Sequence, residues 1–250
     1  MIPKIIHYCW LGSDSYPPKI EQCMRSWKEK LPDYEFRLWD ASVFEIFDNT
    51  YARQALEVKK YAFAADVIRL YALFYYGGIY LDSDVEVLKT FDDLLHLDYF
   101  LGEEYSVGGN HTKIEAAVMG AEKGSEFIGK CLDYYRNRKF IDGLFRYDMQ
   151  KPLPVIMKEI LERNYSLHWI QTPDEIRQSE KDIFILPVEF FSPKSWQTKE
   201  LLALTDKTYT IHHFNMSWVK KRTYSDYFAD MVCYIKNKIK ELFKRSKKNE

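Results

Sequence analysis

The chain has 250 residues, with 36 Lys and Arg against 37 Asp and Glu and a net charge of −1. This length allows one α/β domain with a sizeable core or two small domains, and we expect one. The acidic body excludes an overall basic nucleic-acid-binding surface, and no run approaches 18 uncharged apolar residues, so no membrane-spanning helix is expected.

The first 40 residues predict the opening of a parallel sheet. A strand is expected over 4–10, because these residues are mainly β-branched and aromatic. A helix should start at Pro17 and Pro18 and end at Leu31, and a second strand should cover 34–39. The order strand, helix, strand is typical of a parallel sheet.

The stretch 59–76 predicts a helix that is apolar nearly all round, and such a helix is buried. Gly77 and Gly78 end it, and a short strand over 79–81 leads into Asp82. Further strands are expected over 98–102, 115–120, 183–187 and 208–213. Further helices are expected over 125–136 and 152–163 and from 224 to the basic end.

Two carboxylates, Asp82 and Asp84, directly follow the strand at 79–81. Residues i and i+2 of an extended segment point to the same side, about 6 to 7 Å apart, so both would face one divalent cation. Hard carboxylate oxygens select Mg²⁺ or Mn²⁺ rather than zinc. Alone, such a pair is typical of a solvated turn. The buried helix and apolar strand before it place the pair at the carboxyl edge of a sheet, where α/β proteins bind ligands.

Asp66 and Arg69 are the only charged residues between Lys60 and Asp82, and their i, i+3 spacing puts them on one helix face. One interpretation is a salt bridge that satisfies itself. Since burying two charges is costly, a site for a polyhydroxylated anionic ligand is the better hypothesis. Asp66 would then accept hydrogen bonds from sugar hydroxyls, and Arg69 would face phosphate.

Two further positions could bind a ligand. His212 and His213 lie on a predicted strand, where adjacent side chains point to opposite faces, so at most one is expected to reach the cation. Trp10, with Gly12 after it, ends the first strand and is either a core residue or a platform for a nucleobase. The aromatic content of 16% suits a protein that stacks on sugars or bases, or a core filled with rings.

The segments IIHYCWLG, AADVIRLYALFYYGGIYLDSDVEVL and IHHFNMSW, in this order, resemble the glycosyltransferases of the DXD sugar-binding type. That group includes the yeast initiating α-1,6-mannosyltransferase, bacterial capsule and lipopolysaccharide enzymes and, more distantly, the clostridial large-toxin glucosyltransferase domains. The resemblance implies an α/β fold of GT-A type, a single domain over 1–218 with a Rossmann-like, mostly parallel central sheet flanked by helices. It also implies a Mn²⁺- or Mg²⁺-dependent, retaining hexosyltransferase.

The donor would be a nucleotide diphosphate sugar, with a UDP-sugar favoured over GDP-mannose, and the acceptor a saccharide or lipid-linked saccharide in surface polysaccharide synthesis. The resemblance also implies roles for individual residues: a base contact for Trp10 with Gly12, sugar and diphosphate contacts for Asp66 and Arg69, the donor pocket wall for Tyr80, ribose and metal-bound water for Asp82, direct cation ligation for Asp84, and closure over the diphosphate for Ser217 and Trp218.

The third metal ligand is left open by the sequence. In relatives with the pattern H-x-x-G-x-x-K-P-W the first His ligates the metal, and it matches His212. This chain lacks the Gly and the Lys-Pro pair of that pattern, so His213 and Ser217 are alternatives. Glu103, Glu104 and Glu115 are expected where an acceptor would approach, and no role is assigned to them.

The C-terminal extension 219–250 has ten Lys and Arg against four acids, which gives it a net charge of +6 and leaves −7 for the rest. It predicts a basic amphipathic helix, either lying on an anionic membrane surface or simply solvated. The four cysteines show no zinc or disulfide spacing, so we expect a cytoplasmic protein, peripheral on the inner face of the membrane if the helix binds there. No nucleic-acid partner is expected.

Two rival functions come from other classes of protein. A metal-dependent phosphohydrolase would use Asp82 and Asp84, but it usually needs more acids and histidines around a second metal. A non-catalytic carbohydrate-binding protein would account for the aromatic residues but not for a buried Asp and Arg beside a D-x-D motif.

Overall fold

The computed structural model describes residues 1–12, 15–42, 47–105, 113–142, 146–149, 151–195 and 197–215. The predicted extension 219–250 with its helix, and the site candidates Ser217 and Trp218, lie outside these residues. Among the described residues, no helix is long and apolar enough to span a membrane.

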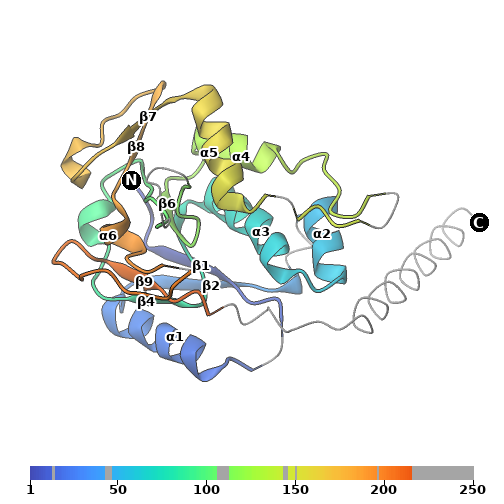
Figure 1. Cartoon of the computed structure of the whole chain (residues 1–250), viewed down its shortest axis with the longest axis horizontal. Coiled ribbons are helices and arrows are strands. Elements are labelled where there is room, and N and C mark those ends of the chain that lie inside the picture. The colour runs from blue at the N-terminus through green and yellow to red at the C-terminus, as the bar shows by residue number, and fades with distance from the viewer. Residues whose placement is uncertain are drawn as a thin grey trace, which may run out of the picture.

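A five-stranded sheet with the strand order β2-β1-β3-β6-β5 forms the centre of the protein (Figure 1). Strand β1 pairs in parallel with both β2 and β3, β6 is antiparallel to β3, and β5 is antiparallel to β6. Four of these five strands therefore run the same way. The strands are β1 (Ile5–Cys9), β2 (Glu35–Trp39), β3 (Gly78–Leu81), β5 (Tyr99–Phe100) and β6 (Val118–Ala121).

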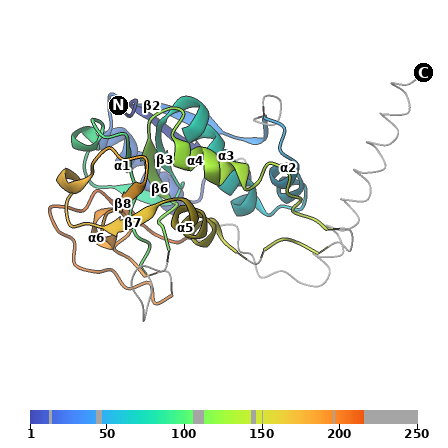
Figure 2. The ribbon, with the colours of Figure 1, turned by 90° about the horizontal axis from the view of Figure 1, so that it is seen from above.

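Helices cover both faces of this sheet (Figures 1 and 2). Helix α1 (Pro18–Lys30) lies on one face, and on the other face lie α2 (Thr50–Glu57), α3 (Tyr61–Tyr76), α4 (Glu126–Asp133) and α5 (Leu153–Asn164). Each face has its own core: Ile6 and Ile79 pack towards the α1 side, and Cys9 and Tyr80 towards the α3 side. The predicted α/β architecture, a mostly parallel sheet flanked by helices, is confirmed.

The remaining elements form small additions to the sheet. Two two-stranded sheets pair β4 (Val85–Val87) with β9 (Thr210–His212) and β7 (Ser166–Trp169) with β8 (Asp182–Ile185). The short helix α6 (Val188–Phe191) and two 3₁₀ turns, Asp92–Leu94 and Pro173–Glu175, complete the described elements. The sequence did not predict α2, β4, β7 or α6, all of which are eight residues or shorter.

The junction between α3 and β3 delivers the D-x-D motif to the sheet edge. Gly77 and Gly78 have φ angles of 67° and 112°, which residues with a side chain rarely adopt. A Cβ atom at Gly77 would lie 2.6 Å from the backbone nitrogen of Lys123. These two glycines allow the buried helix to end and the chain to enter the middle of the sheet at once, so β3 ends immediately before Asp82.

Candidate active site

The D-x-D motif lies in a turn at the carboxyl end of β3. The backbone nitrogen of Val85 donates to the carbonyl oxygen of Asp82 at 3.0 Å, and that of Asp82 donates to Ala117 at 2.8 Å. The prediction of an extended segment at 82–84 was therefore wrong, because the chain reverses here to enter β4. The turn still directs both carboxylates to one place.

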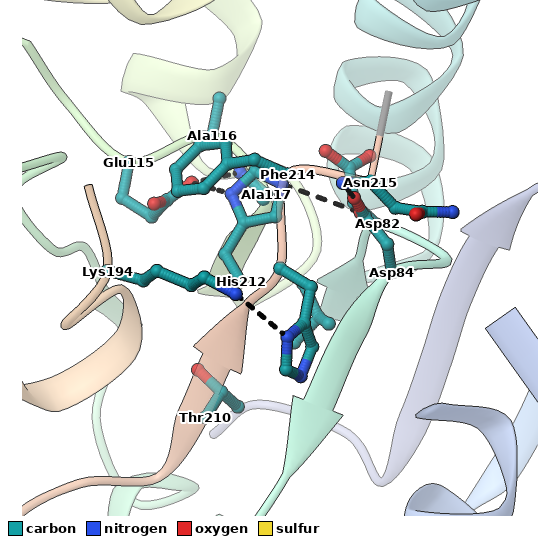
Figure 3. A network of polar contacts seen from close by, with 12 residues as sticks. Asp82, Asp84, Glu115, Ala116, Ala117, Lys194, Thr210, His212, Phe214 and Asn215 are labelled. Atoms are coloured by element: carbon teal, nitrogen blue, oxygen red, sulfur yellow. Dashed lines mark hydrogen bonds and ion pairs between the residues drawn. The ribbon is translucent and has the colours of Figure 1, made fainter. Parts of the chain in front are cut away.

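His212 reaches this place from the far end of the described chain. Strand β9 pairs antiparallel with β4, which sets His212 opposite Val85. The Nε2 atom of His212 lies 3.4 Å from the Oδ1 atom of Asp84, and ligand atoms of Asp82, Asp84 and His212 all lie within 4.8 Å of one another (Figure 3). His213 points the other way, and its Nε2 atom lies 2.7 Å from the Oε2 atom of Glu86. Only one of the two histidines therefore faces Asp82 and Asp84, as predicted.

These three side chains fit a small divalent cation. Two carboxylate oxygens and one imidazole nitrogen suit Mn²⁺ or Mg²⁺, and the 4.8 Å spread is close to the roughly 4.2 Å that separates opposite ligands of an octahedral Mg²⁺ ion. The backbone nitrogen of Asn215 donates to Asp84 Oδ2 at 2.7 Å and leaves Oδ1 facing His212. Three protein ligands leave positions for water or for oxygens of a substrate.

Arg69 joins the buried helix α3 to the motif. Its guanidinium lies 3.1 Å from Asp66 and 3.2 Å from Asp82, and it donates to the carbonyl oxygen of Ala116 at 2.6 Å. It also stacks 4.6 Å from the ring centroid of Tyr80, whose hydroxyl donates to Asp82 at 2.9 Å. Asp66 and Arg69 thus do not form an isolated salt bridge within the helix, because Arg69 connects Asp66 to the D-x-D motif.

The charges at the site are strongly shifted from their ordinary behaviour. Burial raises the pKa of Asp66 to about 6, and Arg69 offsets this rise only in part. Burial also acts to raise the pKa of Asp84, but His212 and the backbone nitrogen of Asn215 outweigh it and lower that pKa to about 2. Burial acts to lower the pKa of His212, yet Asp84 and Glu115 raise it well above 6.5.

Sequence reasoning gave no role to Glu115, which the structure places against His212. Its side chain is 1% exposed, and its Oε1 atom lies 3.8 Å from Nδ1 of His212. The same oxygen accepts a hydrogen bond from the backbone nitrogen of Ala117 at 2.6 Å. The available signal was that Glu115 is the only charged residue between Lys113 and Glu122.

Trp10 and Gly12 follow β1 at the same sheet edge, since β1 and β3 are parallel neighbours. The backbone nitrogen of Trp10 donates to Trp39 at 3.0 Å, and its ring packs on Tyr16 with centroids 4.9 Å apart. Gly12 is exposed, beside Tyr61 at the start of α3.

The structure brings together six of the predicted site residues: Asp66, Arg69, Tyr80, Asp82, Asp84 and His212. Trp10 and Gly12 lie at the same edge of the sheet. Their roles stay predictions.

Residues 17–101 match the family model described as "Glycosyltransferase sugar-binding region containing DXD motif", which confirms the resemblance inferred from the sequence. "Inositol phosphoceramide mannosyltransferase 3" of Schizosaccharomyces pombe is 37% identical over 131 residues, which are 51% of this chain and 35% of that protein. "Mannosyl phosphorylinositol ceramide synthase SUR1" of Saccharomyces cerevisiae is 32% identical over 143 residues, 53% of this chain and 34% of that protein. The chain thus spans about a third of the length of these curated relatives. Among solved structures, the PaToxG glycosyltransferase is 21% identical with a TM-score of 0.48, covering 65% of this chain and 69% of that one.

Proposed function

The chain carries the glycosyltransferase sugar-binding region with its DXD motif, and from this premise we propose that it transfers a hexose from a nucleotide diphosphate sugar to a saccharide or lipid-linked saccharide. One observation carries the proposal. Ligand atoms of Asp82, Asp84 and His212 meet within 4.8 Å, directly beside the buried Arg69 and the partly buried Asp66.

In this proposal, different residues of the site bind different parts of the nucleotide sugar donor. A divalent cation on Asp82, Asp84 and His212 supplies positive charge for the departing diphosphate. Arg69 adds a fixed positive charge on the same side, where burial strengthens its effect. Asp66, held by Arg69, accepts hydrogen bonds from hydroxyls of the transferred sugar. Trp10 stacks on the base, and the resemblance assigns contact with the diphosphate to Ser217 and Trp218, which lie outside the described residues.

The proposed transfer retains the anomeric configuration. The acceptor hydroxyl oxygen forms a bond to the anomeric carbon from the face on which the bond to the diphosphate oxygen breaks, and the hydroxyl proton passes to that departing oxygen. The partners of the site acids support this route over a carboxylate nucleophile. Asp66 and Asp82 are both ion-paired with Arg69, and Glu115 is buried behind His212.

The donor and acceptor classes come from similarity. UDP-sugars are the first choice from the resemblance, and the names of the relatives, which include mannosyl transfer and ceramide, support GDP-mannose and a lipid-linked acceptor as the alternatives. We place the reaction in the cytoplasm, in surface polysaccharide synthesis, at the inner face of an anionic membrane. The free, buried thiols of Cys9, Cys23 and Cys131 support a reducing compartment, and the +6 charge of 219–250 supports the membrane contact.

The test is nucleotide release. The purified chain is incubated with UDP-glucose, UDP-galactose, UDP-N-acetylglucosamine or GDP-mannose, with and without Mn²⁺, and released nucleoside diphosphate is measured. We expect release from one donor that requires Mn²⁺, is lost in Asp84→Ala and is kept in Asp174→Ala, which removes an exposed acid elsewhere. NMR of the product then gives the anomeric configuration.

The rival functions give other results in the same assay. A phosphohydrolase would cleave p-nitrophenyl phosphate as readily as the sugar donors. A carbohydrate-binding protein would bind sugars and release no nucleotide with any donor. Either result, or release that is unchanged in Asp84→Ala, would contradict the proposal.

A further inference from the structure

We propose that Glu115 is a positioning residue that holds the ring of His212 with its Nδ1 side towards the protein and its Nε2 atom towards the cation. The inference rests on the proposed metal-dependent function and assigns a role to a residue outside the D-x-D motif. Figure 3 shows Glu115 and the Asp82–Asp84 pair on opposite sides of the His212 ring. The two ring nitrogens therefore face two different carboxylate groups, at 3.8 Å for Nδ1 and 3.4 Å for Nε2.

Glu115 is more deeply buried than the two aspartates of the motif. Its side chain is 1% exposed, whereas those of Asp84 and Asp82 are 14% and 27% exposed. A buried carboxylate is costly unless it is paired, so its presence needs a partner that gains from the charge. Among the described residues, Oε2 of Glu115 and Nδ1 of His212 are both buried without a hydrogen-bond partner. The nearest charge partner of Glu115 that the structure describes is His212.

The Nδ1 atom of His212 and the Oε1 atom of Glu115 lie 3.8 Å apart, slightly beyond hydrogen-bond distance. A buried N–H group without a partner is unfavourable, so a small rotation that brings Nδ1 within hydrogen-bond distance of Glu115 would stabilise the ring. Glu115 itself is held in place, because its Oε1 atom accepts from the backbone nitrogen of Ala117 at 2.6 Å. The adjacent residue Ala116 accepts from Arg69, so the same backbone segment supports both halves of the site.

The chemistry follows from the two forms of neutral imidazole. When Nδ1 carries the proton and donates to a carboxylate, Nε2 has a free lone pair for a metal ion. Carboxylates behind a ligating histidine fix this form and raise the basicity of the ring, and their loss typically weakens metal binding about 10- to 100-fold. Glu115 has the residue type and placement for this role.

Two substitutions separate the charge from the hydrogen bond. Glu115→Gln keeps an oxygen acceptor for Ala117 and His212 but removes the negative charge. Glu115→Leu removes both at similar size. The matched control is Glu104→Gln, which removes a buried charge of the same sign from a residue that is paired with Lys113 at 2.8 Å.

The experiment is a titration of the full chain with Mn²⁺, following the electron paramagnetic resonance signal of the free ion. We expect binding to weaken about 10-fold in Glu115→Gln, to weaken further, towards 100-fold, in Glu115→Leu, and to change less than about 2-fold in Glu104→Gln. A second readout is the ¹⁵N NMR spectrum of the Mg²⁺-loaded protein. In the parent, Nδ1 of His212 should be protonated, and in Glu115→Leu this form should lose its dominance.

The outcomes are distinguishable. If the parent chain does not bind Mn²⁺, the metal-dependent function itself is overturned, and this inference with it. If the parent binds Mn²⁺ and both Glu115 variants bind it equally well, only the role of Glu115 is wrong. Equal weakening in Glu104→Gln would also overturn that role, because it would show a general effect of negative charge.

Discussion

The guanidinium of Arg69 lies 3.2 Å from the carboxylate of Asp82, so the buried helix α3 is joined directly to the turn that carries the D-x-D motif. Arg69 is 5% exposed, and it has two carboxylates, two carbonyl oxygens and one aromatic ring around it. This single side chain therefore contributes both to the stability of the domain and to the geometry of the candidate site.

Arg69→Ala should lower the free energy of unfolding by about 3 to 5 kcal/mol, because it leaves Asp66 and Asp82 without their buried cation. Urea denaturation followed by circular dichroism measures this change. Arg163→Ala is the control, since Arg163 is 74% exposed and lies 3.8 Å from Glu159. Its effect should be within about 0.5 kcal/mol. Similar losses in the two variants would contradict the assignment of Arg69 as a buried bridge.

UDP with Mn²⁺ should raise the melting temperature. A ligand present at 100 times its Kd stabilises the native state by about 2.7 kcal/mol, or roughly 5 to 10 °C for a chain of this length. Neither UDP alone nor UDP with EDTA should give this shift, and Asp82→Ala should lose it while Asp174→Ala keeps it. Differential scanning fluorimetry measures the shift for each variant against its own ligand-free protein. Equal shifts with and without metal would count against the cation site.

Trp10→Ala should weaken UDP binding without a matching loss of Mn²⁺ binding. Stacking of a base on an aromatic ring is worth about 1 to 3 kcal/mol, which corresponds to a roughly 5- to 150-fold increase in Kd. Trp10→Phe should restore most of the affinity, since it keeps a ring. Isothermal titration calorimetry with UDP in saturating Mn²⁺ checks both. An unchanged Kd in Trp10→Ala would place the base elsewhere.

Stability should fall as the pH drops from 6.5 towards 4, and His7 should cause part of this fall. Burial lowers the pKa of His7 from 6.5 to about 4. Between these two pH values the unfolded chain binds a proton at His7 and the folded chain does not. The stabilisation by neutral His7 is therefore complete above pH 6.5 and is lost progressively as the pH falls from 6.5 to about 4. The shift corresponds to about 3 kcal/mol.

The neutral ring of His7 is fixed by two bonds: Nε2 contacts the carbonyl oxygen of Gly77 at 2.7 Å, and Nδ1 accepts from Trp39 at 3.1 Å. Denaturation measured at pH 7, 6, 5 and 4.5 should show a shallower slope in His7→Gln than in the parent chain. His96→Gln, at an exposed position, should keep the parent slope. An identical slope in His7→Gln would mean that other groups account for the acid sensitivity.

Much of the fold was predictable because its main elements have long-range patterns in the sequence. Helix α3 is apolar nearly all round and ends at two glycines, and the alternation at 34–39 gave β2 within one residue. Strand β4 was missed because three residues carry too little pattern, and its existence depends on pairing with β9. Helix α2 is capped by Asn49, whose side chain accepts a hydrogen bond from the backbone nitrogen of Ala52, but a single cap and eight residues gave too weak a signal to predict it.

The candidate site was likewise predictable only in part. The D-x-D motif and the buried Asp66 and Arg69 were visible as residue types in unusual places, and the structure brings them together. The hydrogen bond from the backbone nitrogen of Asn215 to Asp84 was not predictable, because the backbone N–H group is the same in residues with different side chains. The contact of Glu115 with His212 depends on strand positions that only the complete sheet defines.

The pairing of β4 with β9 has a consequence for biosynthesis. Asp82 and Asp84 precede His212 in the chain, and strand β9 must pair with β4 before the three ligand atoms of the proposed cation site can meet. During synthesis, a chain that has already formed most of its central sheet would therefore still lack the proposed cation site. Proteolysis that removes only the segment around β9 should likewise abolish the proposed cation binding, since β9 is not part of the five-stranded sheet.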